Sequence, residues 1–529
     1  FVGGPPVTCD TAEQHPRDTS PRLRWASWFG LLGVWLGSIS AIHRVSPDLY
    51  HEMAWFREAL QAGGVPIEDV FAYTPTVSPC VHHEWGAGAV FYVLSMSLGS
   101  AGLTLLKYAG ACAVAAGCWL LAKRRGASDA VLSLLAPLAI LCGCIGFLSV
   151  RAQLFTLGGT VGLLHLLEQD RQGGRRWILI WLPVYVVWLN LHAGFLVGVG
   201  LYGIYALGRW VEAYRHLRAI GAATRATRHL WAVAAAMAVL LGVNPYGWQY
   251  GPYLWHAVRL DRPFIAEWQP LWHFPRLLVL YAITWLPLGY VLCRQARQRS
   301  GELLMILVPA LLACQHVRHL SIYAVVWIGY VPPLLAETTA GRAIGLFSCK
   351  HARWLCCLWI GLGVLGVTQA ARNRCWDLRL PLTRAEDPSL QYPAGAVEYL
   401  RAAAFTGHVM VPFEAGAFVS WKLHPAVKVS CDGRYEVAFP PDQVQELWDL
   451  YATAHAWQQT LRRYPPDVVL VPRSSPLEAR LEPLQAAGAD APWQRVYRDD
   501  GYALYARRDL TPRLPPCDRS GQPIAAEFP

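Results

Sequence analysis

The sequence predicts an α-helical polytopic membrane bundle of about eleven spans, followed by a small C-terminal α/β domain outside the cytoplasm. Three observations predict this fold class. Of the 529 residues, 54% are hydrophobic and only 16% are charged, whereas soluble proteins carry roughly a quarter charged residues. Apolar runs as long as a membrane span follow one another through residues 25–370. From residue 375 on, the chain has the mixed composition of a soluble domain.

The bundle is built from these apolar runs. A membrane-spanning helix needs about 20 apolar residues, and somewhat shorter runs are enough inside a bundle. We expect spans at 25–42, 100–121, 129–149, 154–168, 177–190, 195–211, 230–243, 276–293, 302–315, 319–335 and 354–370.

Basic residues predict the orientation of the bundle. Residues 1–370 carry 28 Lys and Arg against 17 Asp and Glu, and the basic clusters fall on every second loop. Because loops rich in Lys and Arg stay in the cytoplasm, we expect a cytoplasmic N-terminal segment at 1–24 and a periplasmic or otherwise extracytoplasmic C-terminal domain. The excess charge lies in short loops rather than on a folded polar surface, so nucleic acid is excluded as a partner.

The outer loop 43–99 is long and carries two further helices. From Leu49 to Leu60 apolar residues repeat at helical spacing, with charged residues on the other face, which predicts an amphipathic helix on the membrane surface that ends at Gly63. The run 85–98 is also apolar, but a full crossing there would reverse every later loop. We therefore predict a re-entrant or interfacial helix; the alternative is that 85–98 crosses and another short run does not.

Residues 375–510 are expected to form a soluble α/β domain, followed by a tail at 511–529. Alternating strand-like and helix-like runs indicate this class. We find no dinucleotide-binding glycine loop and no nucleophile elbow in it. Strands are expected at 408–413, 426–430, 467–471, 495–497 and 502–506, and helices at 394–404, 442–463 and 477–487.

The polar residues of the bundle gather at its outer rim, whereas the expected middle of the bilayer is nearly empty of ionisable groups, with Lys107 the nearest exception. Ion-coupled transporters keep such groups near the middle. Polar groups in a membrane usually mark a working site, so this layout favours chemistry at the outer surface on a substrate held partly in lipid. The rim residues are Asp48, Arg151, Gln153, Asn190, His192, Asn244 and Arg318.

These residue types predict a transfer reaction. A carboxylate near an acceptor hydroxyl serves as a general base, and Asp48 is our first candidate. Arg151 and Arg318 are candidates to bind a phosphate leaving group. Asp69, in a turn-like Glu-Asp, is a second acid or a turn former. Further candidates for substrate binding are His51, His83, Glu84, Gln153, Asn190, His192 and Asn244.

Several of these residues also have a possible structural role instead of a role in the reaction. Asp48 is also a good helix N-cap. The two arginines at the rim are also able to extend toward lipid headgroups. Asn190 is expected to cap the end of a span. Asp432-Gly433-Arg434 is expected to form a turn after a strand, with acceptor binding as the alternative.

A divalent cation is possible but has no clear ligand motif. His82, His83 and Glu84, together with Asp48 and His51, contain suitable donor atoms, and mixed imidazole and carboxylate sets do bind such ions. Their spacing matches no tight metal-ligand pattern. We therefore assign no metal ligands, and the cofactor stays unknown.

Several segments resemble one enzyme family. A first span followed by an acidic residue, surface helices, a bundle and an outer C-terminal domain resembles the GT-C superfamily of membrane glycosyltransferases, which use lipid-phosphate sugars. The stretch SPDLYHEMAWFREALQAGGVPIEDVFAYT…VHHEW resembles the first outer loop of its bacterial protein-mannosyltransferase-like and RgtA/B/C/D-like branch. VRAQLFTL, WLNLHAGF, VRHLSIY and VKVSCDGRYE resemble segments of uncharacterised members.

The resemblance covers most of 25–510 and implies that Asp48 is the catalytic base. It implies a bacterial inner-membrane glycosyltransferase of the cell envelope, which moves a hexose or pentose from a polyprenyl-phosphate donor in the membrane lipid to a glycan, lipid or protein acceptor outside. The sequence departs from the family at two places. Leu49 follows Asp48 where mannosyltransferase relatives have a second acidic residue, and His83-Glu84-Trp85 stands where better-known relatives have an HPP-like motif.

Two other classes remain as alternatives. A non-enzymatic transporter predicts coupling groups at mid-membrane depth and repeated halves, and a ligand-binding sensor predicts a cytoplasmic output domain. A nearer rival, an O-antigen-ligase-like transferase, would lack the early catalytic Asp. The glycosyltransferase hypothesis requires Asp48, His83, Arg151, His192 and Arg318 around one outward cavity.

Overall fold

The computed structural model describes residues 20–42, 44–296, 298–382, 386–387, 390–524, 526 and 528–529, so most of the predicted N-terminal segment 1–24 lies outside the described residues. The chain divides into two compact units. The first contains Phe1–Ala41, Ala115–Ile145 and Glu267–Asn373, and the second contains Ile42–Val114, Gly146–Ala266 and Arg374–Pro529. Each unit is described by itself.

The first unit is a helical bundle around one fully buried helix. α13 is buried at every residue from Leu320 to Leu335, and it lies against α4, α11 and α12. A helix that is apolar on all sides needs such an enclosed position. The helices of this unit, besides the end of α3, are α1 (Pro21–Ile39), α4 (Asp129–Gly143), α11 (Pro275–Gln295), α12 (Ser300–Gln315), α13 (Leu320–Ala336), α14 (Thr339–Lys350) and α15 (Ala352–Arg372).

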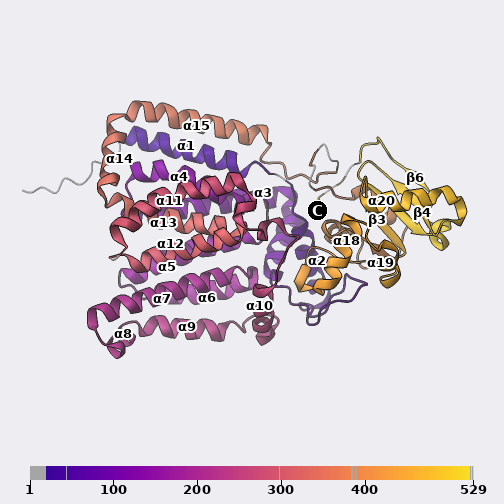
Figure 1. Cartoon of the computed structure of the whole chain (residues 1–529), viewed down its shortest axis with the longest axis horizontal. Helices are drawn as coiled ribbons and strands as arrows, with labels where there is room; N and C mark the ends of the chain where they lie inside the picture. Colours follow the sequence, from indigo (N-terminus) through magenta and orange to yellow (C-terminus); the bar gives the residue numbers. More distant parts are fainter. Residues whose placement is uncertain are drawn as a thin grey trace, which may run out of the picture. The chain divides into compact units, whose positions relative to one another are not determined.

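Within the first unit, α1 and α15 lie side by side (Figure 1). Glycines of the two helices face each other at the contact. An ideal Cβ on Gly33 would lie 2.6 Å from the Cα of Gly363, and one on Gly366 would lie 2.9 Å from the Cα of Gly33. Small residues let helix backbones approach this closely in membranes, so the glycine spacing determines how these two helices pair.

The second unit contains helices of the bundle and the elements that carry the polar rim. α3 is broken at Gly99, whose φ of 59° and ψ of −146° are not helical. The segment 85–98 is therefore an element of its own, as the sequence predicts, and its re-entrant placement stays a prediction. The helices are α2 (Pro47–Ala62), α3 (Trp85–Arg124), α5 (Gln153–Arg171), α6 (Trp177–Leu191), α7 (Phe195–Leu217), α8 (Ile220–Ala226), α9 (Arg228–Leu240) and α10 (Tyr250–Arg259).

Every predicted span coincides with a helix of the structure. Among the described residues, five helices are long and apolar enough to cross a membrane. The chain is therefore a multi-pass membrane protein, whereas the number of about eleven spans stays a prediction. The five are Trp85–Arg124, Asp129–Phe147, Pro275–Gln295, Val317–Ala336 and Ala352–Arg372.

The C-terminal part contains a six-stranded sheet of order β2-β1-β3-β5-β4-β6. β1 pairs in parallel with β2 and β3, β5 pairs antiparallel with β3 and β4, and β6 pairs in parallel with β4. The chain between the parallel strands β1, β2 and β3 runs through α-helices, as such connections usually do, whereas the chain between β4 and β6 runs through β5 and a 3-10 segment. The elements are α16 (Ala394–Ala402), β1 (Gly407–Met410), α17 (Phe413–Leu423), β2 (Val427–Val429), α18 (Pro441–Ala452), α19 (Trp457–Arg463), β3 (Val468–Pro472), α20 (Pro476–Leu481), β4 (Trp493–Arg498), β5 (Tyr502–Arg507) and β6 (Cys517–Asp518).

All five predicted strands are present, and the fold class is confirmed. The structure adds β6 and α17, which the sequence analysis did not predict. The predicted helix 442–463 is two helices, because Ala454 and Ala456 have left-handed φ values of 54° and 48° that a helix cannot contain. The predicted helix 477–487 ends as α20 at Leu481 and continues as a 3-10 segment.

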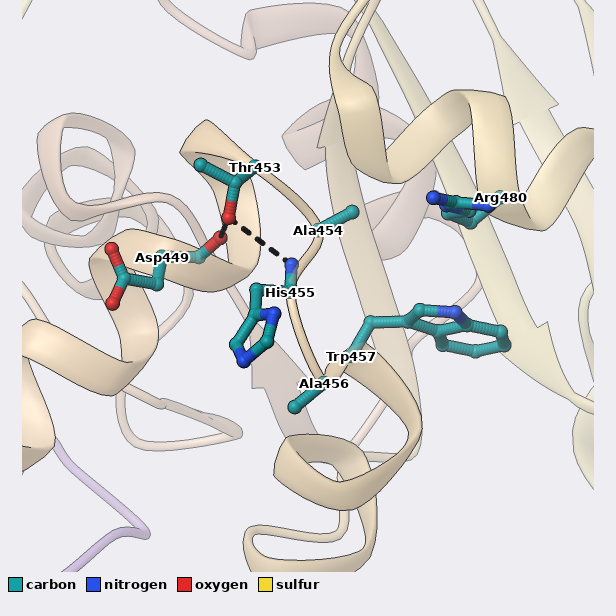
Figure 2. A pocket seen from close by; sticks show the side chains of 7 residues that line it. All are labelled: Asp449, Thr453, Ala454, His455, Ala456, Trp457 and Arg480. Carbon is teal, nitrogen blue, oxygen red and sulfur yellow. Dashed lines mark hydrogen bonds between the residues drawn. The ribbon is translucent and has the colours of Figure 1, made fainter.

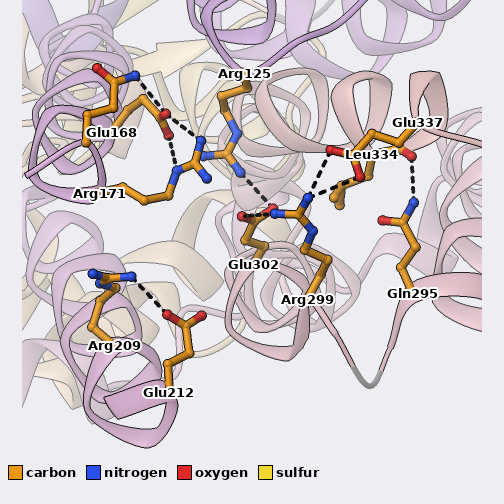
Figure 3. A network of polar contacts seen from close by, with 11 residues as sticks. Arg125, Glu168, Arg171, Arg209, Glu212, Gln295, Arg299, Glu302, Leu334 and Glu337 are labelled. Carbon is orange, nitrogen blue, oxygen red and sulfur yellow. Dashed lines mark hydrogen bonds and ion pairs between the residues drawn. The ribbon is translucent and has the colours of Figure 1, made fainter. Parts of the chain in front are cut away.

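Ion pairs lie near helix ends within each unit, as Figure 3 shows. In the first unit, Arg125 pairs with Glu302 at 2.8 Å, and Arg299 pairs with Glu337 at 3.1 Å. In the second unit, Arg171 pairs with Glu168 at 2.7 Å. Arg125, Arg171 and Arg299 are among the basic loop residues that we predict to lie in the cytoplasm, and these ion pairs neutralise part of that positive charge.

Candidate functional site

The site is built on α2, which begins after Ser46 and ends at Gly63, where a φ of 71° terminates it as predicted. Two of its polar residues, His51 and Glu52, are buried, contrary to the expected amphipathic surface helix. His51 is 6% exposed and Glu52 only 1%. The reason lies in the tertiary structure. α17 of the C-terminal part packs against α2, and Ala72 of the outer loop forms a parallel bridge with Val429 of β2.

Asp48 lies in the first turn of α2 and is paired with Arg151. The Arg151 Nη2 is 2.6 Å from Asp48 Oδ2, and the Ser46 hydroxyl donates to the same oxygen at 3.3 Å. Both side chains are partly exposed. The other oxygen, Oδ1, faces Gly433, where an ideal Cβ would lie 3.6 Å away. The predicted base and the predicted phosphate-binding arginine are thus in direct contact.

Glu84, which directly precedes α3, joins two histidines from different elements. Its Oε1 is 3.1 Å from His192 Nε2 and 3.6 Å from His83 Nε2. Tyr253 of α10 forms a 2.6 Å hydrogen bond with His83 Nδ1. Three segments that are far apart in sequence therefore meet at one carboxylate.

The hydrogen bonds around His192 define which of its ring nitrogens carries the proton. Thr156 Oγ1 accepts a hydrogen bond from Trp188 Nε1 at 3.1 Å and forms a 2.6 Å hydrogen bond with His192 Nδ1. The backbone N–H of Gly194 donates to the same nitrogen at 3.1 Å. Nδ1 is therefore the acceptor, and Nε2 carries the hydrogen toward Glu84.

Gly194 is needed for this arrangement. An ideal Cβ at this position would lie 2.5 Å from His192 Nδ1 and closer still to Thr156 Oγ1, which real Cβ atoms do not tolerate. His192 is among the predicted site residues, whereas Thr156 and Gly194 are not. Their only local signal is the small residue two positions after His192 in WLNLHAGF.

Two carboxyl groups of this region have pKa values shifted in opposite directions. Burial and the neighbouring Glu84 raise the pKa of Glu52 well above its usual value. For Glu84, burial alone would raise the pKa, but the hydrogen bonds from His192 and His83 outweigh it and hold the pKa well below normal. Burial lowers the pKa of His51 despite the nearby Asp48. Ligand atoms of His51, Glu52 and Glu84 lie within 4.8 Å of one another.

The C-terminal part supplies a buried ion cluster beside the site. The guanidinium of Arg434 is fully buried and pairs with Asp432, with Nη2 at 2.8 Å from Oδ2, and with Asp69. Asp69 Oδ2 also accepts the backbone N–H groups of Phe71 and Ala72 at 3.2 and 2.7 Å. These contacts of Asp69 are those of a turn former, one of the two roles that the sequence left open.

Asn190 and Asn244 make capping contacts. Asn190 donates to the carbonyls of Val186 and Val243 at 2.9 Å and accepts a hydrogen bond from Trp85 Nε1 at 3.0 Å. Asn244 donates to the Leu241 carbonyl at 2.7 Å and accepts the Tyr246 N–H at 2.8 Å. The capping role that the sequence favours for Asn190 accounts for its contacts.

Gln153 and Arg318 are the two remaining predicted residues. Gln153 is the first residue of α5. Arg318 belongs to the first compact unit, where its guanidinium lies 4.5 Å from the ring centre of Trp268 and 3.7 Å from Glu267. Within the second unit, the structure brings together six of the predicted residues: Asp48, His51, His83, Glu84, Arg151 and His192.

Two hollows are found in the second unit. One of about 320 Å³ adjoins Tyr253, the partner of His83, and is lined mainly by apolar residues that include Val81 and Phe439. The other, of about 640 Å³, lies between α18, α19 and α20 of the C-terminal part (Figure 2). His455 and Trp457 line it, and Thr453 accepts the His455 N–H at 3.2 Å. Hollows of this size are large enough for small ligands.

No protein-family model matches the sequence, and no curated protein matches it. Several solved structures are similar to the structure of this chain. The apo oligosaccharyltransferase of Archaeoglobus fulgidus is 11% identical, with a TM-score of 0.51 over 91% of this chain and 74% of that chain. Apo ArnT of Cupriavidus metallidurans is 14% identical, with a TM-score of 0.50 over 91% and 97%. ArnT bound to undecaprenyl phosphate is 12% identical, with a TM-score of 0.49 over 91% and 98%.

At these identities the similarity concerns the fold. The oligosaccharyltransferase and apo ArnT are built on the fold of the GT-C superfamily, and the agreement extends over nine-tenths of this chain. The chain therefore has the GT-C fold that the resemblance of its first outer loop predicts.

Proposed function

We propose that the protein is a membrane glycosyltransferase that moves a sugar from a polyprenyl-phosphate carrier to an acceptor on the outer face of the membrane. The pair formed by Asp48 and Arg151 carries this proposal. It places a carboxylate and a guanidinium in contact at 2.6 Å, on a GT-C fold, at the position where the resemblance expects the base. A base and a phosphate-binding cation are the two groups that such a transfer needs.

In the proposed reaction, the acceptor hydroxyl attacks C1 of the donor sugar. The new bond forms between the acceptor oxygen and C1, while the bond between C1 and the phosphate oxygen breaks. The bonding electrons leave with the polyprenyl phosphate, and the hydroxyl proton goes to Asp48. Direct displacement inverts the configuration at C1.

Arg151 links substrate binding to the base. Its guanidinium is about one-third exposed and is therefore reachable from solvent. A carrier phosphate that binds Arg151 competes for the same hydrogen-bond donors that hold Asp48, and so makes Asp48 Oδ2 available to the acceptor. We propose His51, His83, Glu84 and His192 as the wall of the substrate site.

The carrier is supported by a structural neighbour, whereas the acceptor is proposed from the resemblance alone. ArnT, whose apo structure shares this fold, has also been crystallised with undecaprenyl phosphate, which suggests a polyprenyl phosphate as the carrier. The apolar hollow beside Tyr253 is our candidate for the apolar part of a substrate. A glycan, a lipid or a protein serves as the acceptor, and a hexose or pentose is transferred.

Transport is the less favoured class. Lys107, the ionisable residue nearest to the expected middle of the membrane, donates to the carbonyls of Leu148 and Ile42 at 2.6 and 2.8 Å. These backbone contacts give it a structural role rather than that of a coupling group.

The test uses the purified full chain in detergent with a panel of labelled polyprenyl-phosphate sugars, and it measures release of sugar to water or to an acceptor. We expect release with at least one donor, and a loss of roughly a hundredfold or more in Asp48→Asn, as for removal of a general base. Asp442→Asn, an exposed carboxylate at the start of α18, is the control and should keep the rate. Release by Asp48→Asn at the rate of the unmodified protein would refute the assignment.

A further inference from the structure

We propose that His51, Glu52 and Glu84 bind one divalent cation of the Mn²⁺ or Zn²⁺ type. The proposal concerns three residues of which the sequence analysis assigned none to a metal. It concerns binding alone and does not rest on the proposed transfer reaction.

The geometry of the three side chains is suited to a single ion. α2 supplies His51 and Glu52, and the segment before α3 supplies Glu84. Their ligand atoms lie within 4.8 Å of one another. Ligands at about 2.0–2.2 Å on opposite sides of a cation are separated by about 4 Å, so small side-chain rotations bring all three into contact with one ion.

Unpartnered polar atoms at the same place are the second observation. Among the described residues, Glu52 Oε2 and His51 Nδ1 are buried and have no hydrogen-bond partner. Both ring nitrogens of His82 are also buried without a hydrogen-bond partner. The ring centres of His51 and His82 are 5.5 Å apart. Buried polar groups nearly always have a partner. Several such atoms together therefore indicate that a ligand belongs there.

Glu84 is already oriented as a metal ligand. His192 and His83 both contact its Oε1, so Oε2 is the oxygen that can bind a cation. His192 is in turn held by Thr156 at 2.6 Å, and His83 by Tyr253 at 2.6 Å. Hydrogen bonds of this kind behind a ligating carboxylate are the usual support of metal sites.

The donor set selects the class of cation. Mg²⁺ and Ca²⁺ prefer oxygen ligands only, and Mg²⁺ keeps several of its waters. An imidazole nitrogen with two carboxylates in a buried site favours a transition-metal ion. A divalent charge also balances two ionised carboxylates, which would otherwise be costly to bury. Asp48, one turn before His51 and Glu52, is not among the ligands.

The competing explanation is that Glu52 is protonated and shares its proton with Glu84, with no ion present. The two explanations differ in what Glu52→Gln does. Glutamine has the shape of a protonated glutamate, so without an ion the substitution changes little. With an ion it removes a charged ligand and weakens binding.

The experiment measures metal binding by the purified full chain in detergent. After treatment with a chelator, the protein is titrated separately with MnCl₂, ZnCl₂ and MgCl₂, and both bound metal and the midpoint of thermal unfolding are recorded. We expect one equivalent of Mn²⁺ or Zn²⁺ with a rise in the midpoint, and much weaker binding of Mg²⁺. Glu52→Gln should bind at least about tenfold more weakly, as loss of site support does, while its metal-free midpoint stays unchanged.

Glu58→Gln is the matched control. Glu58 lies on the same helix and pairs with His424 at 3.4 Å, so this variant should bind metal like the unmodified chain. Absence of stoichiometric binding of both transition metals would overturn the proposal. So would equal affinity of Glu52→Gln and the unmodified chain, which would assign any bound metal to other histidines. Sugar release plays no part in these readouts, so the transfer hypothesis stands or falls separately.

Discussion

Replacing Arg434 with methionine tests how the C-terminal part is fastened to the outer loop. The guanidinium is the cation between two buried carboxylates, Asp432 and Asp69. It also lies 5.1 Å from the ring centre of Phe71 and 5.5 Å from that of Trp55. Methionine keeps much of the apolar stem and removes the charge, so Arg434→Met leaves two carboxylates buried without their partner.

The expected cost follows from the complete burial of the cluster. The side chains of Arg434 and Asp69 are 0% exposed, and that of Asp432 is 1% exposed. Removing one member of a buried ion pair typically costs about 3–5 kcal/mol, because the remaining charge is uncompensated. For a cooperative unit of roughly 150–250 residues, this corresponds to a fall of about 6–20 °C in the unfolding midpoint.

The assay is thermal unfolding in detergent, together with the rate of proteolysis within residues 374–529. A second-site suppressor variant separates the effect of the lost charge from the effect of altered packing. The triple variant Asp69→Asn, Asp432→Asn, Arg434→Met has no buried charge, and we expect it to recover most of the lost midpoint, since neutral replacements of whole buried ion clusters are often tolerated.

The pH dependence supplies a second readout. Burial alone would raise the pKa of Asp432, but Arg434 outweighs it and holds the pKa below its usual value. Its stabilising contribution is therefore present above the unfolded pKa of about 3.9 and is lost only as the pH falls through the lower folded value. In Arg434→Met, burial prevails and the folded pKa rises, so that variant should gain stability as the pH falls from 8 to 5. A midpoint within 2 °C of the unmodified chain, or a triple variant no better than the single one, would refute this reasoning.

Two glycine substitutions test the other close contacts. Gly194→Ala should lower the unfolding midpoint, because the new Cβ would lie 2.5 Å from His192 Nδ1 and overpacking costs about 1–3 kcal/mol. If the transfer hypothesis holds, this variant should also release sugar more slowly. An unchanged midpoint together with an unchanged rate would show that the contacts of His192 adjust without cost. Gly366→Ala should destabilise the pair of α1 and α15, whereas Gly361→Ala on the same helix, with nothing within 4 Å of its Cβ, should be neutral in the same thermal assay. Equal effects of the two substitutions in α15 would contradict the proposed close packing.

Local sequence patterns predicted most of the helices and strands. Each apolar run forms a helix because its hydrogen bonds are made within the segment, and α2 stops at Gly63 because glycine adopts a left-handed conformation easily. The five strands of the C-terminal part were also predicted correctly, because short apolar runs between turn residues are a local signal. α17 was not, because its apolar residues satisfy a buried helix and a buried strand equally well.

By itself the sequence determined the helices, the class of the C-terminal domain and the candidates Asp48, Arg151, Glu84 and His192, because spacing and residue type suffice for these. Only the tertiary structure decided what the candidates contact. Asp69 and Arg434 are 365 positions apart, and Tyr253 and His83 are 170 apart, so no local pattern records their pairing. The burial of Glu52 was decided in the same way, since a residue on the polar face of a helix becomes buried only when another element covers it, here α17 and the outer loop.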